Sequence, residues 1–126
     1  MNDNLALNVG DVLLRRKLLG FWHPGVAVGP DAVFHNTPER GEHLSSVAQF
    51  AAGESIEVRP TGADPRSVIA RARDALSRPR RYNLATRNCE HTVSEILWGF
   101  AKSPTFVCAG AVILLALATY LVFRGR

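Results

Sequence analysis

The stretch HPGVAVGPDAVFHN, residues 23–36, decides how the N-terminal part of this chain folds. Two short apolar runs, Gly25–Val28 and Ala32–Asn36, flank a Gly-Pro-Asp triplet at residues 29–31. Glycine and proline between two runs of strand-forming residues are typical of a tight turn. The stretch therefore predicts a β-hairpin.

The length of the hairpin loop sets which side chains share a face of the sheet. A three-residue loop at 29–31 pairs Val28 with Ala32 and Gly25 with His35. In that register His23 and His35 point to the same face as diagonal neighbours, about 7 Å apart. A loop of two or four residues puts them on opposite faces, because side chains alternate along a strand.

The segments around the hairpin predict a small α+β domain over residues 1–103, with the strands first and the helices later. We expect further strands at DVLLR (11–15) and IEVR (56–59), and a helical turn at 45–52. Asp64 followed by Pro65 is a favourable helix start, and this helix runs to Ser77, before Pro79. Asn88 is a favourable N-cap for a second helix.

Cys89 follows that N-cap in the tetrapeptide Asn-Cys-Glu-His, residues 88–91. A cysteine in the first helical turn meets the positive end of the helix dipole, which favours thiolate over thiol. A histidine from the hairpin can act as its base, and a second can orient the first. We expect Cys89 to be a nucleophile, His23 its base and His35 the orienting third member. With the backbone N–H of Cys89 as oxyanion donor, the chemistry is acyl transfer through a thioester.

The other polar residues near the thiol have supporting roles in this interpretation. His91 lies two positions after Cys89, about 200° around the helix, and is expected to brace the helix from behind. Asn88 and Glu90 act as capping and dipole partners, and His43 is expected in an exposed loop. A zinc site of Cys89, His91, His23 and His35 is the alternative, but the direction of His91 and the lack of a Cys-x-x-Cys pair argue against it.

Four pieces of this sequence together resemble a known family. They are Gly10-Asp11-Val12, His23 before a strand, Val33-Phe34-His35, and the Asn-Cys-Glu-His motif at 88–91. The chain resembles the lecithin:retinol acyltransferase-like family, a circularly permuted branch of the NlpC/P60 papain-like superfamily. The resemblance implies a permuted papain-like α+β fold with an antiparallel sheet and packed helices. It also implies Cys89 as nucleophile with His23 and His35, glycerophospholipid acyl chains as substrate, and neither metal nor cofactor.

The C-terminal part is different in kind. Residues 105–123, TFVCAGAVILLALATYLVF, contain no charged side chain. Nineteen helical residues span about 28 Å, close to the hydrocarbon thickness of a bilayer. We expect a transmembrane helix at 104–123 and a short tail at 124–126. Residues 1–20 carry charges and lack the apolar core of a signal peptide. The expected arrangement is a C-terminal membrane anchor with the catalytic domain on the cytoplasmic side.

The net charge of +4 is concentrated in one region. Seven arginines and one acid, Asp74, lie between residues 66 and 87. Next to a membrane span, such a patch is suited to anionic lipid head groups. We expect head-group contacts from four of these residues: Arg78, Arg80, Arg81 and Arg87. Nucleic acid is not expected as a partner, because no aromatic residues interleave the arginines before Tyr82.

The favoured function is a membrane-anchored, cysteine-dependent phospholipase or acyltransferase, with phospholipid membranes and lipid substrate as partners. Two alternatives stay open: a cysteine peptidase or amidase of the NlpC/P60 type, and a non-catalytic membrane tether. The sequence leaves the acyl donor, the acceptor, hydrolysis against transfer, and the oligomeric state open.

Overall fold

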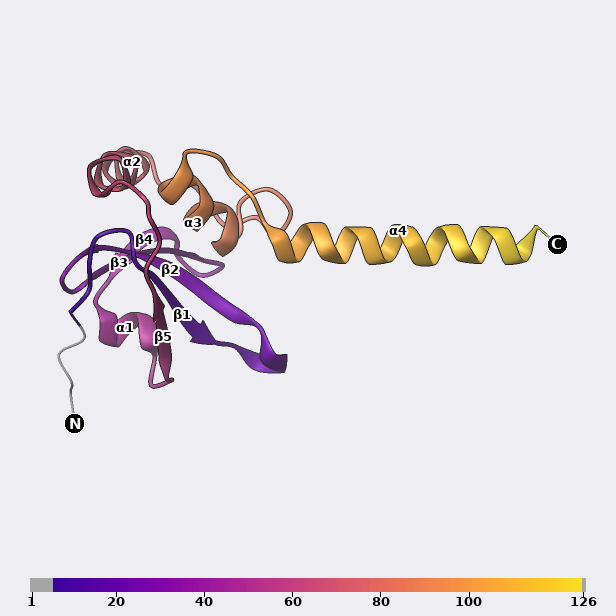
Figure 1. Ribbon diagram of the computed structural model, residues 1–126, viewed down its shortest axis with the longest axis horizontal. Helices are drawn as coiled ribbons and strands as arrows, with labels where there is room; N and C mark the ends of the chain where they lie inside the picture. The colour runs from indigo at the N-terminus through magenta and orange to yellow at the C-terminus, as the bar shows by residue number, and fades with distance from the viewer. Residues whose placement is uncertain (1–5, 126) are drawn as a thin grey trace.

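A computed structural model describes residues 6–125 as an α+β domain from which one long helix projects (Figure 1). The domain contains one five-stranded antiparallel sheet with the strand order β4-β3-β2-β1-β5. The strands are β1 (Val12–Arg16), β2 (Trp22–Gly29), β3 (Ala32–Thr37), β4 (Gly41–Ser45) and β5 (Ile56–Arg59). The helices are η1 (Leu18–Gly20), α1 (Val47–Ala51), α2 (Pro65–Ser77), α3 (Cys89–Trp98) and α4 (Pro104–Arg124). The predicted α+β class and the order of strands and helices are confirmed.

The two faces of the sheet are covered by different helices. Val26 and Phe34 lie in the larger apolar cluster, together with buried residues of α2 and α3. The smaller cluster lies on the other face and contains Ala27 of β2, Val33 of β3 and Phe50 of α1. Because side chains alternate along β2 and β3, each of these strands contributes to both clusters.

The hairpin between β2 and β3 forms, but its loop differs from the predicted one. Gly29, not Val28, pairs with Ala32, so that the loop is two residues long and a β-bulge lies between Ala27 and Gly29. The bulge inserts one residue, which returns the strands to the expected register at Ala27–Val33 and Val26–Phe34. The predicted pair of Val28 with Ala32 is therefore wrong, whereas the shared face of the two histidines is preserved.

The helix starts follow the capping residues that the sequence indicates. Asp64 caps α2 by accepting from the backbone N–H of Ser67, and Pro65 occupies the first helical position. Asn88 caps α3 by accepting from the N–H groups of Glu90 and His91. Both helices begin where the sequence predicts, because a side-chain acceptor satisfies N–H groups that the first turn leaves unpaired.

Helix α4 extends away from the domain (Figure 1). Its apolar side chains are exposed along most of its length. Its segment Val107–Arg124 has a mean hydropathy of 2.1, and none of it is buried. An exposed apolar helix of this kind has the length and composition needed to cross a bilayer.

Candidate active site

Two histidines from neighbouring strands form a buried hydrogen-bonded chain. Nε2 of His23 on β2 lies 2.9 Å from Nδ1 of His35 on β3. Nε2 of His35 lies 2.7 Å from Oγ of Ser45 on β4. Both rings are almost completely buried. The predicted proximity of the two histidines is confirmed, and Ser45 is a third member that the sequence analysis missed.

The ring of Phe50 lies against both histidines and helps to bury them, which lowers their pKa values. It stacks on His23 at a centroid distance of 5.5 Å and meets His35 edge-on at 5.1 Å. Burial, followed by the repulsion from His35 and Arg15, lowers the pKa of His23 to about 2. Burial and the neighbouring His43 lower the pKa of His35 to about 3. Both imidazoles are therefore neutral at physiological pH.

His43 lies in the site rather than in an exposed loop, so that this prediction is wrong. It is a residue of β4, directly opposite His35, and the ring centroids are 4.2 Å apart. Its Nδ1 lies 2.7 Å from the carbonyl oxygen of Gly41. The polar residues that were expected in a loop begin β4, which pairs with β3 and forms the edge of the sheet.

Cys89 is the first residue of α3, as predicted, and its side chain is buried. The Asn88 cap uses the N–H groups of Glu90 and His91. The N–H of Cys89, which is the expected oxyanion donor, is not used by this cap, and together with the N–H of Glu90 it favours the thiolate. His91 accepts from the backbone N–H of Asn88, which completes a capping box. Asn88 and His91 thus hold the start of the helix that carries the thiol.

The protonation state of Cys89 differs from the prediction. Burial raises the pKa of the thiol; Lys17 opposes this shift, and Glu90 adds to it. The helix N-terminus favours a thiolate, but the loss of solvent outweighs it. The resting site therefore contains a neutral thiol and neutral imidazoles rather than an ion pair.

The strand arrangement limits how Cys89 and His23 can meet. Alternation along β2 places His23 on the face of Ala27 and Phe50, whereas α3 packs mainly on the face of Val26. The β2–β3 ladder stops at Val26–Phe34, before the histidines. Within residues 6–125, no hydrogen bond joins Cys89 to either histidine. Nδ1 of His23 is buried and has no hydrogen-bond partner.

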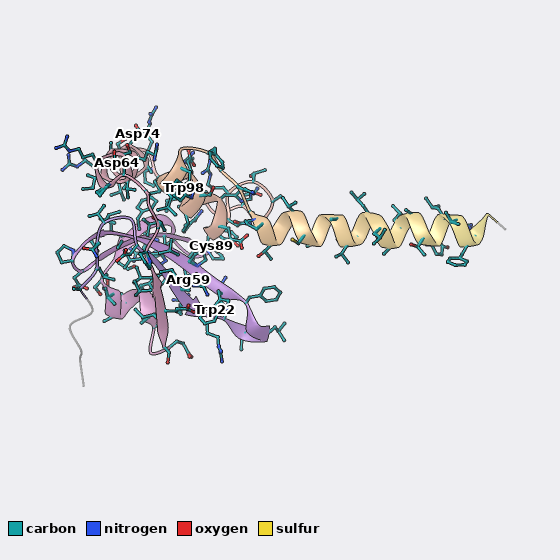
Figure 2. The ribbon with its side chains drawn as sticks, viewed as in Figure 1. Trp22, Arg59, Asp64, Asp74, Cys89 and Trp98 are labelled. Atoms are coloured by element: carbon teal, nitrogen blue, oxygen red, sulfur yellow. The ribbon has the colours of Figure 1, made fainter. Side chains whose placement is uncertain are left out.

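A cavity of about 390 Å³ opens at Cys89 and extends to the base of α4. Its lining includes Trp22, Tyr82, Leu84 and Cys89 from the domain, and Ala109 from α4. Figure 2 shows Cys89 and Trp22 on the part of the domain that lies toward α4. A substrate that reaches the thiol through this cavity passes alongside an apolar helix.

Glu90 links the start of α3 to the start of α4, a function that its sequence neighbourhood did not reveal. Its carboxylate accepts from the backbone N–H of Thr105 at 3.2 Å and from the Thr105 hydroxyl at 2.6 Å. It also accepts from the hydroxyl of Ser103, which in turn accepts from the side-chain amide of Asn88 at 3.0 Å. The residue after Cys89 therefore caps the projecting helix.

The four arginines expected at lipid head groups divide into two pairs. Arg80 and Arg87 both bind Glu95, and both lie near the fully buried carboxylate of Glu42. They hold β4 against α3, a structural role that the sequence analysis missed. Arg78 and Arg81 are exposed, and Arg78 has only a weak contact with Asp74 at 3.4 Å. Head-group contact stays a prediction for all four arginines, and the second pair has fewer contacts within the domain to give up.

Across the described residues, no group of three or more His, Cys, Asp or Glu side chains is placed to hold a metal ion. A comparison with protein families matches lecithin retinol acyltransferase over residues 6–102. A search of curated proteins found no match. The matched range includes the sheet, the histidine pair and all of α3, and the fold is of the permuted papain-like type. The chain therefore belongs to the lecithin retinol acyltransferase family.

Proposed function

We propose that this protein is a membrane-anchored thiol acyltransferase or phospholipase that takes acyl chains from glycerophospholipids. One observation carries the proposal. A buried chain of two histidines and a serine ends in an unpartnered Nδ1 on His23, and the helix-start thiol opens into a cavity beside an apolar helix. An unsatisfied buried nitrogen is costly, and it is suited to accept a proton during the reaction.

The hydrogen-bond chain sets the direction of proton transfer. If Nε2 of His23 donates to His35, then Nε2 of His35 donates to Ser45, and Nδ1 of His23 is a free acceptor. In this tautomer His35 positions the base and stabilises its charged form, as the third member of a triad does. The pairing of β2 with β3 ends at Val26–Phe34, and the proposed approach of the thiol to Nδ1 is beyond this end. Because Nδ1 of His23 is buried in the resting site, this approach requires side chains to move.

The reaction is a double displacement at an ester carbonyl. Sγ of Cys89 attacks the carbonyl carbon while Nδ1 of His23 takes the thiol proton, because the resting thiol is neutral. The N–H of Cys89 stabilises the oxyanion. Collapse breaks the ester bond, and the leaving lysophospholipid oxygen takes the proton from His23. Water, an amine or a lysolipid then attacks the thioester carbonyl while His23 removes its proton. The C–S bond breaks, the acyl chain leaves as a fatty acid, an amide or an ester, and the departing sulfur takes the proton back from His23.

The proposal places α4 in the bilayer that supplies the substrate. Ala109 of α4 lines the cavity of Cys89, and Glu90 fixes the first turn of α4 next to the nucleophile. In the proposed topology the catalytic domain lies on the cytoplasmic side. The membrane then has two functions: it retains the enzyme, and it presents ester carbonyls at the mouth of the cavity.

The direct test is product release from phosphatidylcholine in mixed micelles, with quantification of lysophosphatidylcholine and free or transferred fatty acid. Cys89→Ser should lose activity by about 10³-fold or more, while Cys108→Ser on α4 should keep it. The two substitutions are chemically identical, so that they separate the nucleophile from a general effect of losing a thiol. Equal activity of both variants, or turnover of amide substrates alone, would reject the proposal.

A further inference from the structure

The turn between β1 and β2 exposes apolar side chains at a place where soluble domains carry polar ones. Leu18 and Leu19 are 89% and 93% exposed, and Phe21 is 54% exposed. We refer to residues Leu18–Phe21 as the hairpin tip. In Figure 1 the tip projects from the sheet on the side of the domain from which α4 leaves. A contiguous exposed apolar group of this kind marks an interaction surface.

The backbone of the tip holds these side chains outward at an energetic cost. Leu19 has a φ of 62°, in the left-handed region that non-glycine residues rarely occupy. Such a conformation costs on the order of 1 kcal/mol or more and persists where the surroundings or a function require it. A leucine that is both strained and fully exposed is suited to an apolar partner outside the domain.

The position of the tip relative to α4 indicates which partner that is. Phe21 lines a cavity of about 600 Å³ together with Cys108, Ala109 and Val112 of α4. These three residues lie within Val107–Arg124, the segment that is long and apolar enough to span a membrane. If this segment spans a bilayer, Phe21 lies at the same depth as the first turns of the span. Its ring is then on the acyl-chain side of the lipid head groups.

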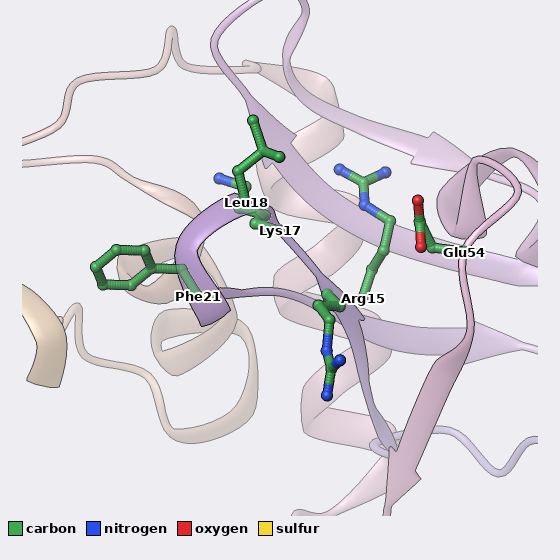
Figure 3. Close-up of a pocket in the computed structure, with 6 residues that line it drawn as sticks. Arg15, Lys17, Leu18, Phe21 and Glu54 are labelled. Carbon is green, nitrogen blue, oxygen red and sulfur yellow. The ribbon is translucent and has the colours of Figure 1, made fainter.

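The charges beside the tip fit the same partner. Arg16 and Lys17 are exposed immediately before Leu18, and the guanidinium of Arg16 lies 5.5 Å from the centroid of the Trp22 ring. In Figure 3 the ring of Phe21 points away from Arg15 and Glu54, off the opposite side of the tip. Apolar side chains with cations at their base match a lipid leaflet, where acyl chains lie beneath phosphate groups.

We infer that the hairpin tip inserts Leu18, Leu19 and Phe21 into the bilayer leaflet that α4 enters, with Arg16 and Lys17 at the lipid phosphates. The inference rests on the proposed location of α4 in a bilayer. Lys17, Phe21 and Trp22 also line the cavity of Cys89. Insertion of the tip therefore opens that cavity toward the leaflet, so that a phospholipid reaches the thiol without leaving the membrane.

The test measures the depth of single residues in the full chain, reconstituted in nanodiscs of phosphatidylcholine and phosphatidylserine. A background of Cys89→Ser and Cys108→Ser removes both native thiols. Nitroxide labels are then attached at Leu19→Cys, Val112→Cys and Asp74→Cys. Asp74 is exposed on α2 and lies away from α4 (Figure 2). Accessibility to oxygen and to a water-soluble nickel chelate reports whether each label is in lipid or in water.

We expect the Leu19 label to resemble the Val112 label, accessible to oxygen and protected from nickel, while the Asp74 label remains accessible to nickel. A Leu19 label that behaves like Asp74, beside a lipid-embedded Val112, would overturn the inference and leave the proposed function intact. A Val112 label accessible to nickel would overturn both. Because this background lacks the thiol, the result does not depend on catalysis.

A functional variant gives a second readout. Leu18→Glu with Leu19→Glu should lower turnover of phosphatidylcholine in vesicles by about tenfold, because two leucines inserted in the leaflet contribute appreciably to membrane binding. Neither residue lines the cavity of Cys89, so that turnover of a water-soluble short-chain ester should not change. Equal losses on both substrates would show that the tip acts on the fold of the site rather than on the membrane.

Discussion

Nε2 of His23 lies 2.9 Å from Nδ1 of His35, and both rings are buried. The pair is formed by residues twelve positions apart, on adjacent strands joined by a bulged hairpin. Because Nε2 of His23 is used by this contact, only its Nδ1 is available for chemistry. The roles proposed for the site follow from that division between the two ring nitrogens.

Replacing His35 tests its positioning role. His35→Ala removes the group that fixes the tautomer of His23, and we expect the rate of thioester formation to fall by about 10²-fold or more. His43→Ala is the matched control, because His43 contacts the ring of His35 without a hydrogen bond to His23. Rates should be measured by single turnover, with KM for the lipid unchanged in His35→Ala. Similar losses in both variants would indicate a packing effect.

The two buried histidines predict a loss of stability in acid. Their pKa values in the folded state, about 2 and about 3, lie below the unfolded value of 6.5. Below pH 6.5 the unfolded chain binds protons that the folded chain does not. The contribution is therefore complete above pH 6.5 and is lost progressively, down to about pH 3 for His35 and about pH 2 for His23. The free energy of unfolding should fall by up to about 1.4 kcal/mol per pH unit for each histidine.

Urea unfolding of the full chain in detergent between pH 7 and pH 5 measures this slope. In His35→Asn the slope of the unfolding free energy against pH should decrease by the contribution of one histidine, whatever the effect of the substitution on stability at pH 7. A stability that does not change over this range would contradict the burial of neutral imidazoles.

The buried thiol predicts an alkaline reactivity profile. Because burial raises the pKa of Cys89, alkylation by iodoacetamide should increase with pH and show an inflection above the ordinary thiol value of about 8.5. Cys108→Ser provides a chain in which only Cys89 reacts. Rapid alkylation at pH 6 with an acidic inflection would instead indicate a thiolate–imidazolium pair in the resting enzyme.

The two kinds of arginine should differ in stability. Arg80→Ala removes a guanidinium that binds both Glu95 and the buried carboxylate of Glu42. Glu42 keeps Arg87 and the Thr92 hydroxyl as partners, so we expect a destabilisation of about 2 kcal/mol, the value of charge-assisted hydrogen bonds rather than of an unpaired buried charge. Arg78→Ala removes an exposed i,i+4 contact and should cost less than about 0.5 kcal/mol. Denaturant unfolding of the two variants measures the difference. Equal small effects would restore Arg80 as a candidate for head-group binding.

The sequence was sufficient for features that depend on local chemistry. Asn88 and Asp64 satisfy N–H groups within their own first turns, so that the starts of α2 and α3 were predictable from a few residues. The alternation of side chains along a strand correctly placed His23 and His35 on one face. The loop is one residue shorter than predicted, but the bulge between Ala27 and Gly29 adds that residue back and so keeps the register.

Features that depend on distant segments were missed or were predicted wrongly. Ser45 and Phe50 reach the histidines from β4 and α1, and no local pattern marks them as members of the site. The strand that contains His43 was interpreted as a loop because its residues are polar. Its buried carboxylate, Glu42, is paired with Arg80, which lies 38 positions further along the chain. The raised pKa of Cys89 results mainly from burial of the thiol. The position of a cysteine at the start of a helix does not reveal how deeply the folded chain buries it.

The most direct measurement is the intact mass of the full-length protein after brief incubation with phosphatidylcholine vesicles. The account predicts a hydroxylamine-sensitive adduct of one fatty acyl chain on the wild-type protein and on Cys108→Ser, and none on Cys89→Ala. Such an adduct is the thioester through which the acyl chain passes. The absence of any adduct, together with the absence of lysophosphatidylcholine in the same vesicles, would contradict the account.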